Sequence, residues 1–207
     1  STYVYQILAE DIKAMGVDTV FGLMSDDTAH FCVSLDAVGV DFLGARHENT
    51  AITMADGYAA ATGRLAVVCV GRGPAMANGL HGATFASRTG NPVLIIQGDV
   101  AIPGGSANGQ GPDYKGVDAE GVLKAAGVRT FKPTGASTAR QTLADAATAA
   151  RRGAAVVLLL PVNVQAAEIE ILADDVGPAP VDARPIPKRV GKPARPQAIA
   201  AAIALLS

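Results

Sequence analysis

The chain has 207 residues, a formal net charge of −2 and a hydrophobic content of 49%. A nearly neutral chain with scattered basic residues gives no basis for binding nucleic acid or an anionic membrane surface. No apolar run approaches the roughly 20 residues of a membrane-spanning helix. Because the first residues fit an amphipathic helix rather than a signal peptide, we expect a globular cytoplasmic protein. Cys32 and Cys69 have no metal-binding spacing, and Cys69 is expected in the core.

The first half of the chain alternates between helical and extended patterns. Apolar residues recur at helical spacing from Val4 to Met15 and predict a first helix, which Gly16 ends. Short apolar runs that predict strands follow at residues 17–21, 40–44, 65–70 and 93–97. The run at 65–70 is continuously apolar, which is typical of a strand buried on both faces of a parallel sheet.

The second half continues this alternation after an irregular stretch. Residues 98–117 hold many glycines and no clear period, and a loop of that length is commonly functional or mobile. Beyond it, the sequence predicts helices over 122–126 and 138–151 and strands over 128–131 and 155–160. The alternation predicts an α/β fold, with a parallel sheet of about six strands, helices on both faces and right-handed crossovers.

The character of the chain changes after Pro161. Residues 166–195 are rich in proline and lack periodicity, so we expect an extended linker there. An alanine-rich helix is predicted from Pro196 onward. We interpret residues 1–165 as one domain and 196–207 as the truncated start of a further, middle domain. The alternative is that the last helix folds back on the first domain or on a second copy.

One acid, Glu48, stands where chemistry is expected. It follows the strand predicted at 40–44 and begins a helix, because Ala51, Met54 and Ala55 recur at helical spacing. A carboxylate in a dry site is costly unless something binds it, and such sites are where pKa values are tuned. The alternative is a first-turn acid that stabilises the helix dipole from solvent.

Four predicted strand-to-helix junctions meet at the same edge of the sheet, where open parallel sheets bind their ligands. They are residues 22–27, 46–48, 71–74 and 97–99. Gly71 and Gly73 permit close approach of the backbone to a ligand. A dinucleotide-binding motif is not supported, because Met76 stands where its third glycine is required.

The motifs at these junctions are similar to those of a known family. They are Arg-His-Glu-Asn at 46–49, Met-Ala-Asp-Gly-Tyr-Ala at 54–59, Thr-Gly at 62–63, Gly-Pro at 73–74, Asn78, Pro92 and Gly98. In this order, over about residues 2–165, the chain resembles the N-terminal pyrimidine-binding domain of thiamine-diphosphate-dependent enzymes. The nearest likeness is to the group of acetolactate synthase, benzoylformate decarboxylase and pyruvate decarboxylase.

The resemblance implies a function and a set of site residues. Glu48 would bind and activate the aminopyrimidine of thiamine diphosphate, in an enzyme that decarboxylates or carboligates 2-oxo acids. Asp26 corresponds to an active-site aspartate of pyruvate decarboxylase-like members, so Glu48 and Asp26 are the candidate catalytic residues. The candidate cofactor-binding residues are Glu48, Ser25, Gly71, Gly73, Pro74 and Asn78. No metal ligand is assigned.

Several positions depart from the family pattern. Ala75 stands where the family has glycine, so a positive φ there would strain the backbone. Arg72 replaces a small polar residue, and Met-Ser at 24–25 replaces proline-glycine. Tyr-Lys-Gly at 114–116 stands where acetolactate synthases often have Phe-Gln-Glu. The 2-oxo acid, and the choice between decarboxylase and carboligase, therefore stay open.

The diphosphate and its Mg²⁺ would require a Gly-Asp-Gly stretch and a spaced asparagine, which the family carries in another domain. Gly-Asp-Val at 98–100 is not such a stretch. The resemblance therefore implies Mg²⁺ held outside this chain, in a homodimer or homotetramer or by a partner chain with the diphosphate-binding domain. The alternative function is a non-catalytic α/β module for assembly or regulation, in which Glu48 is only a helix-end acid.

Overall fold

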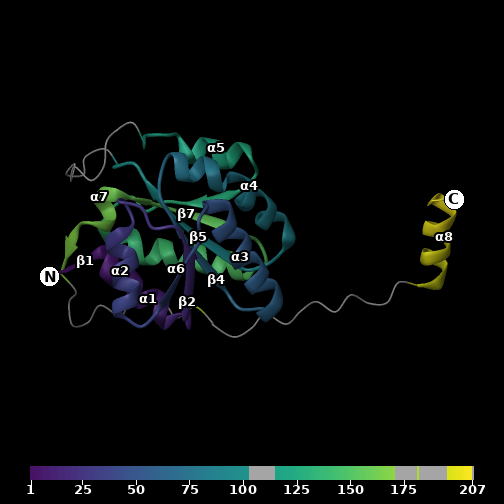
Figure 1. Cartoon of the computed structure of the whole chain (residues 1–207), viewed down its shortest axis with the longest axis horizontal. Coiled ribbons are helices and arrows are strands. Elements are labelled where there is room, and N and C mark those ends of the chain that lie inside the picture. Colours follow the sequence, from purple (N-terminus) through teal and green to yellow (C-terminus); the bar gives the residue numbers. More distant parts are fainter. Residues whose placement is uncertain (103–114, 171–180, 182–194, 207) are drawn as a thin grey trace.

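A computed structural model of the chain describes residues 1–102, 115–170, 181 and 195–206. Its centre is a six-stranded sheet in the order β3-β2-β4-β5-β7-β6, with every neighbouring pair parallel (Figure 1). The strands are β2 (Thr19–Gly22), β3 (Asp41–Gly44), β4 (Ala66–Val70), β5 (Val93–Asp99), β6 (Arg129–Phe131) and β7 (Val156–Pro161). The predicted parallel α/β fold is confirmed, and each predicted strand boundary lies within two residues of the observed one.

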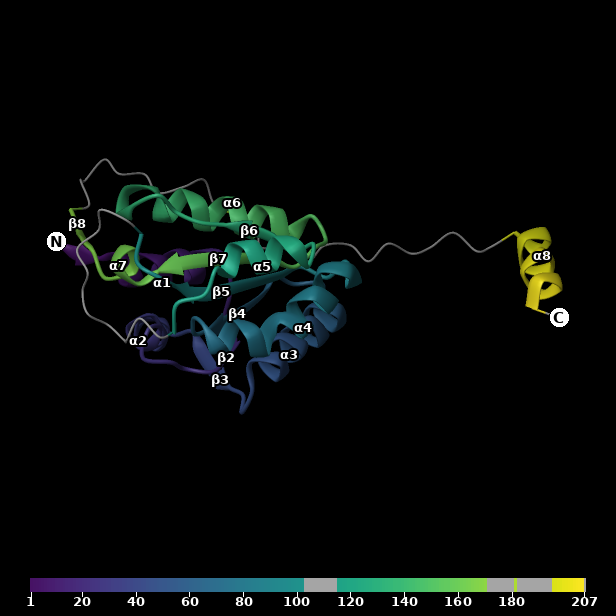
Figure 2. The ribbon, with the colours of Figure 1, turned by 90° about the horizontal axis from the view of Figure 1, so that it is seen from above.

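Helices cover both faces of the sheet, as predicted. One layer consists of α1 (Val4–Ala14), α2 (Ala29–Ala37) and α6 (Ala139–Arg151). The other consists of α3 (Glu48–Thr62), α4 (Pro74–Thr89) and α5 (Ala119–Ala125). Figure 2 shows α6 on one side of the sheet and α3 and α4 on the other.

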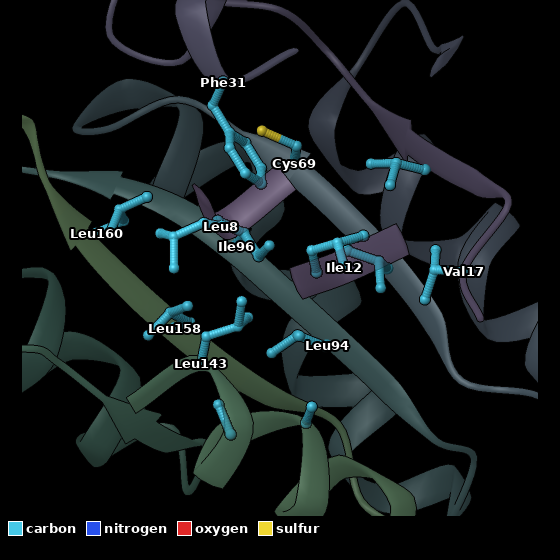
Figure 3. Packing of buried hydrophobic residues seen from close by; sticks show 14 of the residues in the cluster. Leu8, Ile12, Val17, Phe31, Cys69, Leu94, Ile96, Leu143, Leu158 and Leu160 are labelled. Carbon is cyan, nitrogen blue, oxygen red and sulfur yellow. The ribbon is translucent and has the colours of Figure 1, made fainter. Parts of the chain in front are cut away.

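The core lies in two layers because alternate strand residues face opposite sides. On β4, Val67 and Cys69 pack with the layer of α1, α2 and α6, where Leu8, Ile12 and Leu143 meet the sheet (Figure 3). The intervening β4 residues pack with the layer of α3, α4 and α5. All five residues of β4 are buried, as its continuous apolar run predicts. Cys69 is a fully buried core residue, also as predicted.

Three features differ from the expectation or were not predicted. A two-stranded antiparallel sheet joins β1 (Thr2–Tyr3) to β8 (Glu168–Ile169), so the start of the segment interpreted as a linker pairs with the N-terminus. The short helix α7 (Val162–Gln165) precedes it. Helix α5 begins at Ala119, ahead of the predicted residue 122, because the Asp118 side chain caps it by accepting from the Gly121 N–H.

The structure describes only part of the predicted segments that lie outside the sheet. Most of the expected linker, and residues 103–114 of the glycine-rich stretch, lie there. The helix predicted from Pro196 is present as α8 (Pro196–Leu206). Among the helices that the structure describes, none has the length and apolar character to cross a membrane.

Two glycines allow α3 and α4 to pack closely. A Cβ added at Gly82 would lie 2.9 Å from Asn49 Oδ1 and 3.1 Å from Ile52 Cβ, and one at Gly79 would lie 3.1 Å from Ile52 Cδ1. The backbone of α4 therefore sits directly on the first turns of α3. This contact brings the N-terminal regions of the two helices together at the carboxyl edge of the sheet.

We predict that Gly82→Ala destabilises the protein. The added methyl group overlaps α3 and should lower the free energy of unfolding by about 1–3 kcal/mol, despite alanine's better helix propensity. The control is Gly57→Ala on α3, where an added Cβ meets nothing within 4 Å. That change should instead raise the unfolding free energy by roughly 0.5–1 kcal/mol. Denaturant unfolding of both variants measures the difference, and equal stabilisation by both would contradict the tight contact.

Candidate active site

The four predicted junctions do lie along one edge of the sheet. Gly22 at the end of β2 is in register with Gly44 at the end of β3 and with Cys69 near the end of β4. Val70 on β4 is in turn in register with Gln97 on β5. The loops that follow these strands therefore face a common region, where side chains distant in sequence can act on one ligand.

Glu48 is the first residue of α3 and is buried, with 8% of its surface exposed. His47 caps the helix, since its Nδ1 accepts a hydrogen bond from the Asn49 N–H at 3.2 Å. Asn78 of α4 donates from Nδ2 to Glu48 Oε2 at 3.1 Å. Within the described part of the chain, Oε1 has no such donor. One carboxylate oxygen is thus held across the helix pair while the other remains available to a ligand.

The junction after β4 turns sharply into α4. Gly73 precedes the helix with a φ of 62° and a ψ of −113°, a conformation open to glycine, and Pro74 occupies the first turn. Ala75 does not have the positive φ that would strain it, because no non-glycine residue in the described ranges has a positive φ. The turn places its positive φ at Gly73, two residues earlier.

A side chain at position 71 would collide with a neighbouring loop, which is a second reason for a glycine there besides close approach of a ligand. A Cβ at this position would lie 2.6 Å from the Ser25 Cβ, so Gly71 makes room for the loop after β2. Ser25 was predicted to line the site, and its hydroxyl group hydrogen-bonds the carboxylates of Asp26 and Asp27. The structure thus brings the loops after β2 and β4 into direct contact.

Asp27 is a site residue that sequence reasoning missed. It is 2% exposed, and its Oδ2 accepts the Arg72 N–H at 2.9 Å while its Oδ1 accepts the Ser25 hydroxyl. Gly98 at the end of β5 lies against the same carboxylate and leaves no room for a Cβ. Gln165 also donates to the Asp27 carbonyl at 2.6 Å. Asp27 therefore joins the carboxyl ends of β2, β4 and β5.

Asp26, its neighbour, has a different environment. It forms an ion pair with Lys115 at 2.5 Å, and the side chains are 49% and 19% exposed respectively. The hydrogen bond from Lys115 is the main cause that lowers the pKa of Asp26 to about 2. Asp26 is therefore ionised at neutral pH. Lys115 was noted in the sequence only as a departure from the family pattern.

Two other charged groups lie at this edge. Arg72, between the two junction glycines, is 6% exposed. Lys132, after β6, lies 2.6 Å from Oδ2 of the nearly buried Asp99. No group of three or more His, Cys, Asp or Glu within the described residues is arranged to hold a metal ion.

We predict that Lys115→Met raises the pKa of Asp26 from about 2 toward the ordinary value of 3.8. A carboxylate whose pKa is lowered on folding contributes stability above its unfolded pKa and loses it as the pH falls. Lys115→Met should therefore reduce the acid sensitivity of the native state between pH 3.8 and about 2. A ¹³C NMR titration of the Asp26 carboxyl group measures the shift. Lys124→Met, which removes an exposed lysine of α5, should leave it unchanged, and an identical titration in Lys115→Met would contradict the ion pair.

Comparisons with known proteins indicate a cofactor-binding domain, in agreement with the geometry of the site. A family model described as "Thiamine pyrophosphate enzyme, N-terminal TPP binding domain" matches residues 2–119. An acetolactate synthase large subunit from Buchnera aphidicola subsp. Schizaphis graminum is 37% identical over 97 residues, which cover 46% of this chain and 17% of that protein. Acetolactate synthase isozyme 3 large subunit of Escherichia coli is 34% identical with the same coverage.

A relative named for a different activity is 2-hydroxyacyl-CoA lyase 2 of Danio rerio, which is 31% identical over 94 residues, or 45% of this chain and 15% of that protein. The matched segment thus spans less than a fifth of each of these relatives. Because the family match covers more than half of the 207 residues, the chain belongs to the thiamine pyrophosphate enzymes and carries their N-terminal TPP-binding domain.

Proposed function

We propose that this chain supplies the pyrimidine-binding part of a thiamine-diphosphate site, in an enzyme that decarboxylates or carboligates 2-oxo acids. The observation that carries the proposal is the buried Glu48 carboxylate, hydrogen-bonded by the described residues at only one oxygen. A buried acid is costly to keep without a partner, so a Glu48 oxygen without a donor among the described residues fits a ligand that shares a proton there.

The residues present fit an aminopyrimidine ring. Glu48 Oε1 is available to a ring nitrogen, while Asn78 donates a hydrogen bond to the other oxygen. Gly73 presents backbone without a side chain at the start of α4, the helix that carries Asn78. When bound, thiamine diphosphate supplies a nucleophilic carbon and an electron sink for decarboxylation.

Each site residue has a distinct role in the proposed function. Glu48 holds and releases a proton at Oε1, and its burial excludes water from that proton. Asp27 is a positioning residue, because it holds the Arg72 N–H between the two junction glycines. Ser25 and the ionised Asp26 face the substrate side, with Lys115 as their cation.

The remaining half of the site is proposed to come from elsewhere. Mg²⁺ and the diphosphate would be held by a diphosphate-binding domain, in a homodimer or homotetramer or in a partner chain. The acetolactate synthase relatives support action on 2-oxo acids. A non-catalytic module would have no use for a buried acid with an available oxygen, which disfavours that alternative.

The proposal predicts that Glu48→Gln abolishes most proton transfer while preserving the fold. Glutamine keeps the shape of the side chain and a hydrogen bond but cannot exchange the proton. Loss of the C2 proton from the cofactor should therefore slow by roughly a hundredfold or more. Exchange of the cofactor's C2 proton, followed by NMR in the loaded enzyme, measures the effect. Cofactor affinity should fall less than turnover.

The matched control is Glu120→Gln, which removes an exposed acid from the first turn of α5. It should leave the exchange rate at the wild-type value, and both variants should unfold at similar denaturant concentrations. Equal exchange rates in wild type and Glu48→Gln would remove Glu48 as the activating acid and with it the basis of the proposal.

A further prediction concerns the 207-residue chain by itself. We expect it to bind thiamine diphosphate weakly or not at all, since its described residues hold no metal cluster for the diphosphate. Calorimetry with Mg²⁺ present measures the affinity, with a full-length acetolactate synthase as the positive control. Micromolar or tighter binding to residues 1–207 would show that this chain holds the diphosphate without help.

A further inference from the structure

We propose that Lys115 is a specificity-determining residue that binds a substrate carboxylate retained in the product. The proposal rests on the proposed action on 2-oxo acids and adds to it the class of compound that the site prefers. That class carries an anionic group in addition to the carboxylate lost as carbon dioxide. Lys115 is suited to this role by its position, by the exposure of its present partner and by the electron flow of the reaction.

Lys115 lies between two of the loops that form the site. Its ammonium group contacts Asp26, in the loop after β2. Its backbone carbonyl packs against Gly73 so closely that a Cβ there would collide with it. Gly73 is the residue before α4, and Asn78, about one turn into that helix, holds Glu48. Lys115 therefore connects the loop after β2, through its ammonium group, with the junction before α4, through its backbone.

The partner of Lys115 is suited to being displaced. The Lys115 side chain is 19% exposed, whereas the Asp26 side chain is 49% exposed. A half-exposed carboxylate regains water easily when it gives up an ion pair, so exchange costs little. Lys132 at the same edge contrasts with this, because its partner Asp99 is only 5% exposed and has no comparable access to water. Asp26 thus holds the ammonium in place until another carboxylate replaces it.

The electron flow decides which carboxylate Lys115 can usefully bind. In decarboxylation the C1–C2 bond breaks, its electron pair stays on C2 for the bound cofactor to accept, and the carboxylate leaves as neutral carbon dioxide. A cation on that carboxylate would stabilise the substrate more than the transition state and would slow the reaction. A carboxylate elsewhere keeps its charge throughout, so contact with Lys115 strengthens binding without this penalty.

The retained carboxylate can belong to the donor substrate or to the acceptor substrate. Steady-state kinetics on the full enzyme, loaded with thiamine diphosphate and Mg²⁺, distinguishes these two sources. Pyruvate and 2-oxoglutarate are compared as donors, and acetaldehyde and pyruvate as acceptors. Lys115→Met should raise KM about tenfold or more only for the compound with the retained carboxylate, with kcat within about twofold of wild type. Lys115→Arg should restore most of the KM, and Lys124→Met should change nothing.

The pattern of the KM changes decides the matter. A rise confined to 2-oxoglutarate supports a donor with a second carboxylate, and a rise confined to the pyruvate acceptor supports an acceptor acid. An equal rise for both members of each pair, or no rise at all, overturns the proposal, because Lys115 would then not distinguish a retained carboxylate.

A binding measurement tests Lys115 independently of turnover. Acetate and glutarate are titrated separately into the full protein while the ¹³C signal of the Asp26 carboxyl group is followed. Displacement from Lys115 should shift this signal in the wild type and in Lys124→Met but not in Lys115→Met. If neither compound shifts the wild-type signal, the proposal is overturned. Absence of turnover with every 2-oxo acid would instead overturn the proposed function, and this titration would still decide the role of Lys115.

Discussion

The close contact between α3 and α4 is the constraint on which the site depends. Gly79 and Gly82 remove the side chains that would hold the helices apart, and Asn78 then reaches Glu48 at 3.1 Å. Glu48 sits at the N-terminus of α3, whose unpaired N–H groups favour a negative charge. The same packing that buries the carboxylate thus also stabilises it. A wider helix separation would leave Glu48 solvated and would break its hydrogen bond with Asn78.

Two adjacent aspartates show how one short loop serves both structure and chemistry. Asp27 is buried and satisfied by neutral donors, including the Arg72 N–H, so it fixes the loop after β4. Asp26 is half-exposed and satisfied by the Lys115 cation. The first set of bonds is costly to break because a buried charge would lose its donors. The ion pair between Asp26 and Lys115 is more easily exchanged, which is why we propose that a substrate carboxylate binds there.

The strands and Glu48 were predictable because their signals are local. Continuous apolar runs define β4 and its neighbours, and helical spacing after Glu48 defines α3. The pairing of β1 with β8 was not predictable, because two-residue strands have no period and their partners are far apart in the sequence. Asp27 was not predicted as a site residue, because its significance depends on Gly98 and Arg72, which are far from it in the sequence. Lys115 lies within the stretch without periodicity, so only its contacts identify it.

The charges at the carboxyl edge leave Glu48 in a distinctive position. Asp26 is neutralised by Lys115 and Asp99 by Lys132, in both cases through a direct ion pair. Glu48 has no cation at ion-pair distance among the described residues, and its single hydrogen bond comes from a neutral amide. A carboxylate paired with a cation is held in its ionised form and gives up a proton too readily to share it. Among the residues that the structure describes, Asp27 also lacks a cation, but both of its carboxylate oxygens accept hydrogen bonds, whereas Glu48 accepts one at Oε2 alone. Glu48 is therefore the acid that we propose shares a proton with a ligand nitrogen.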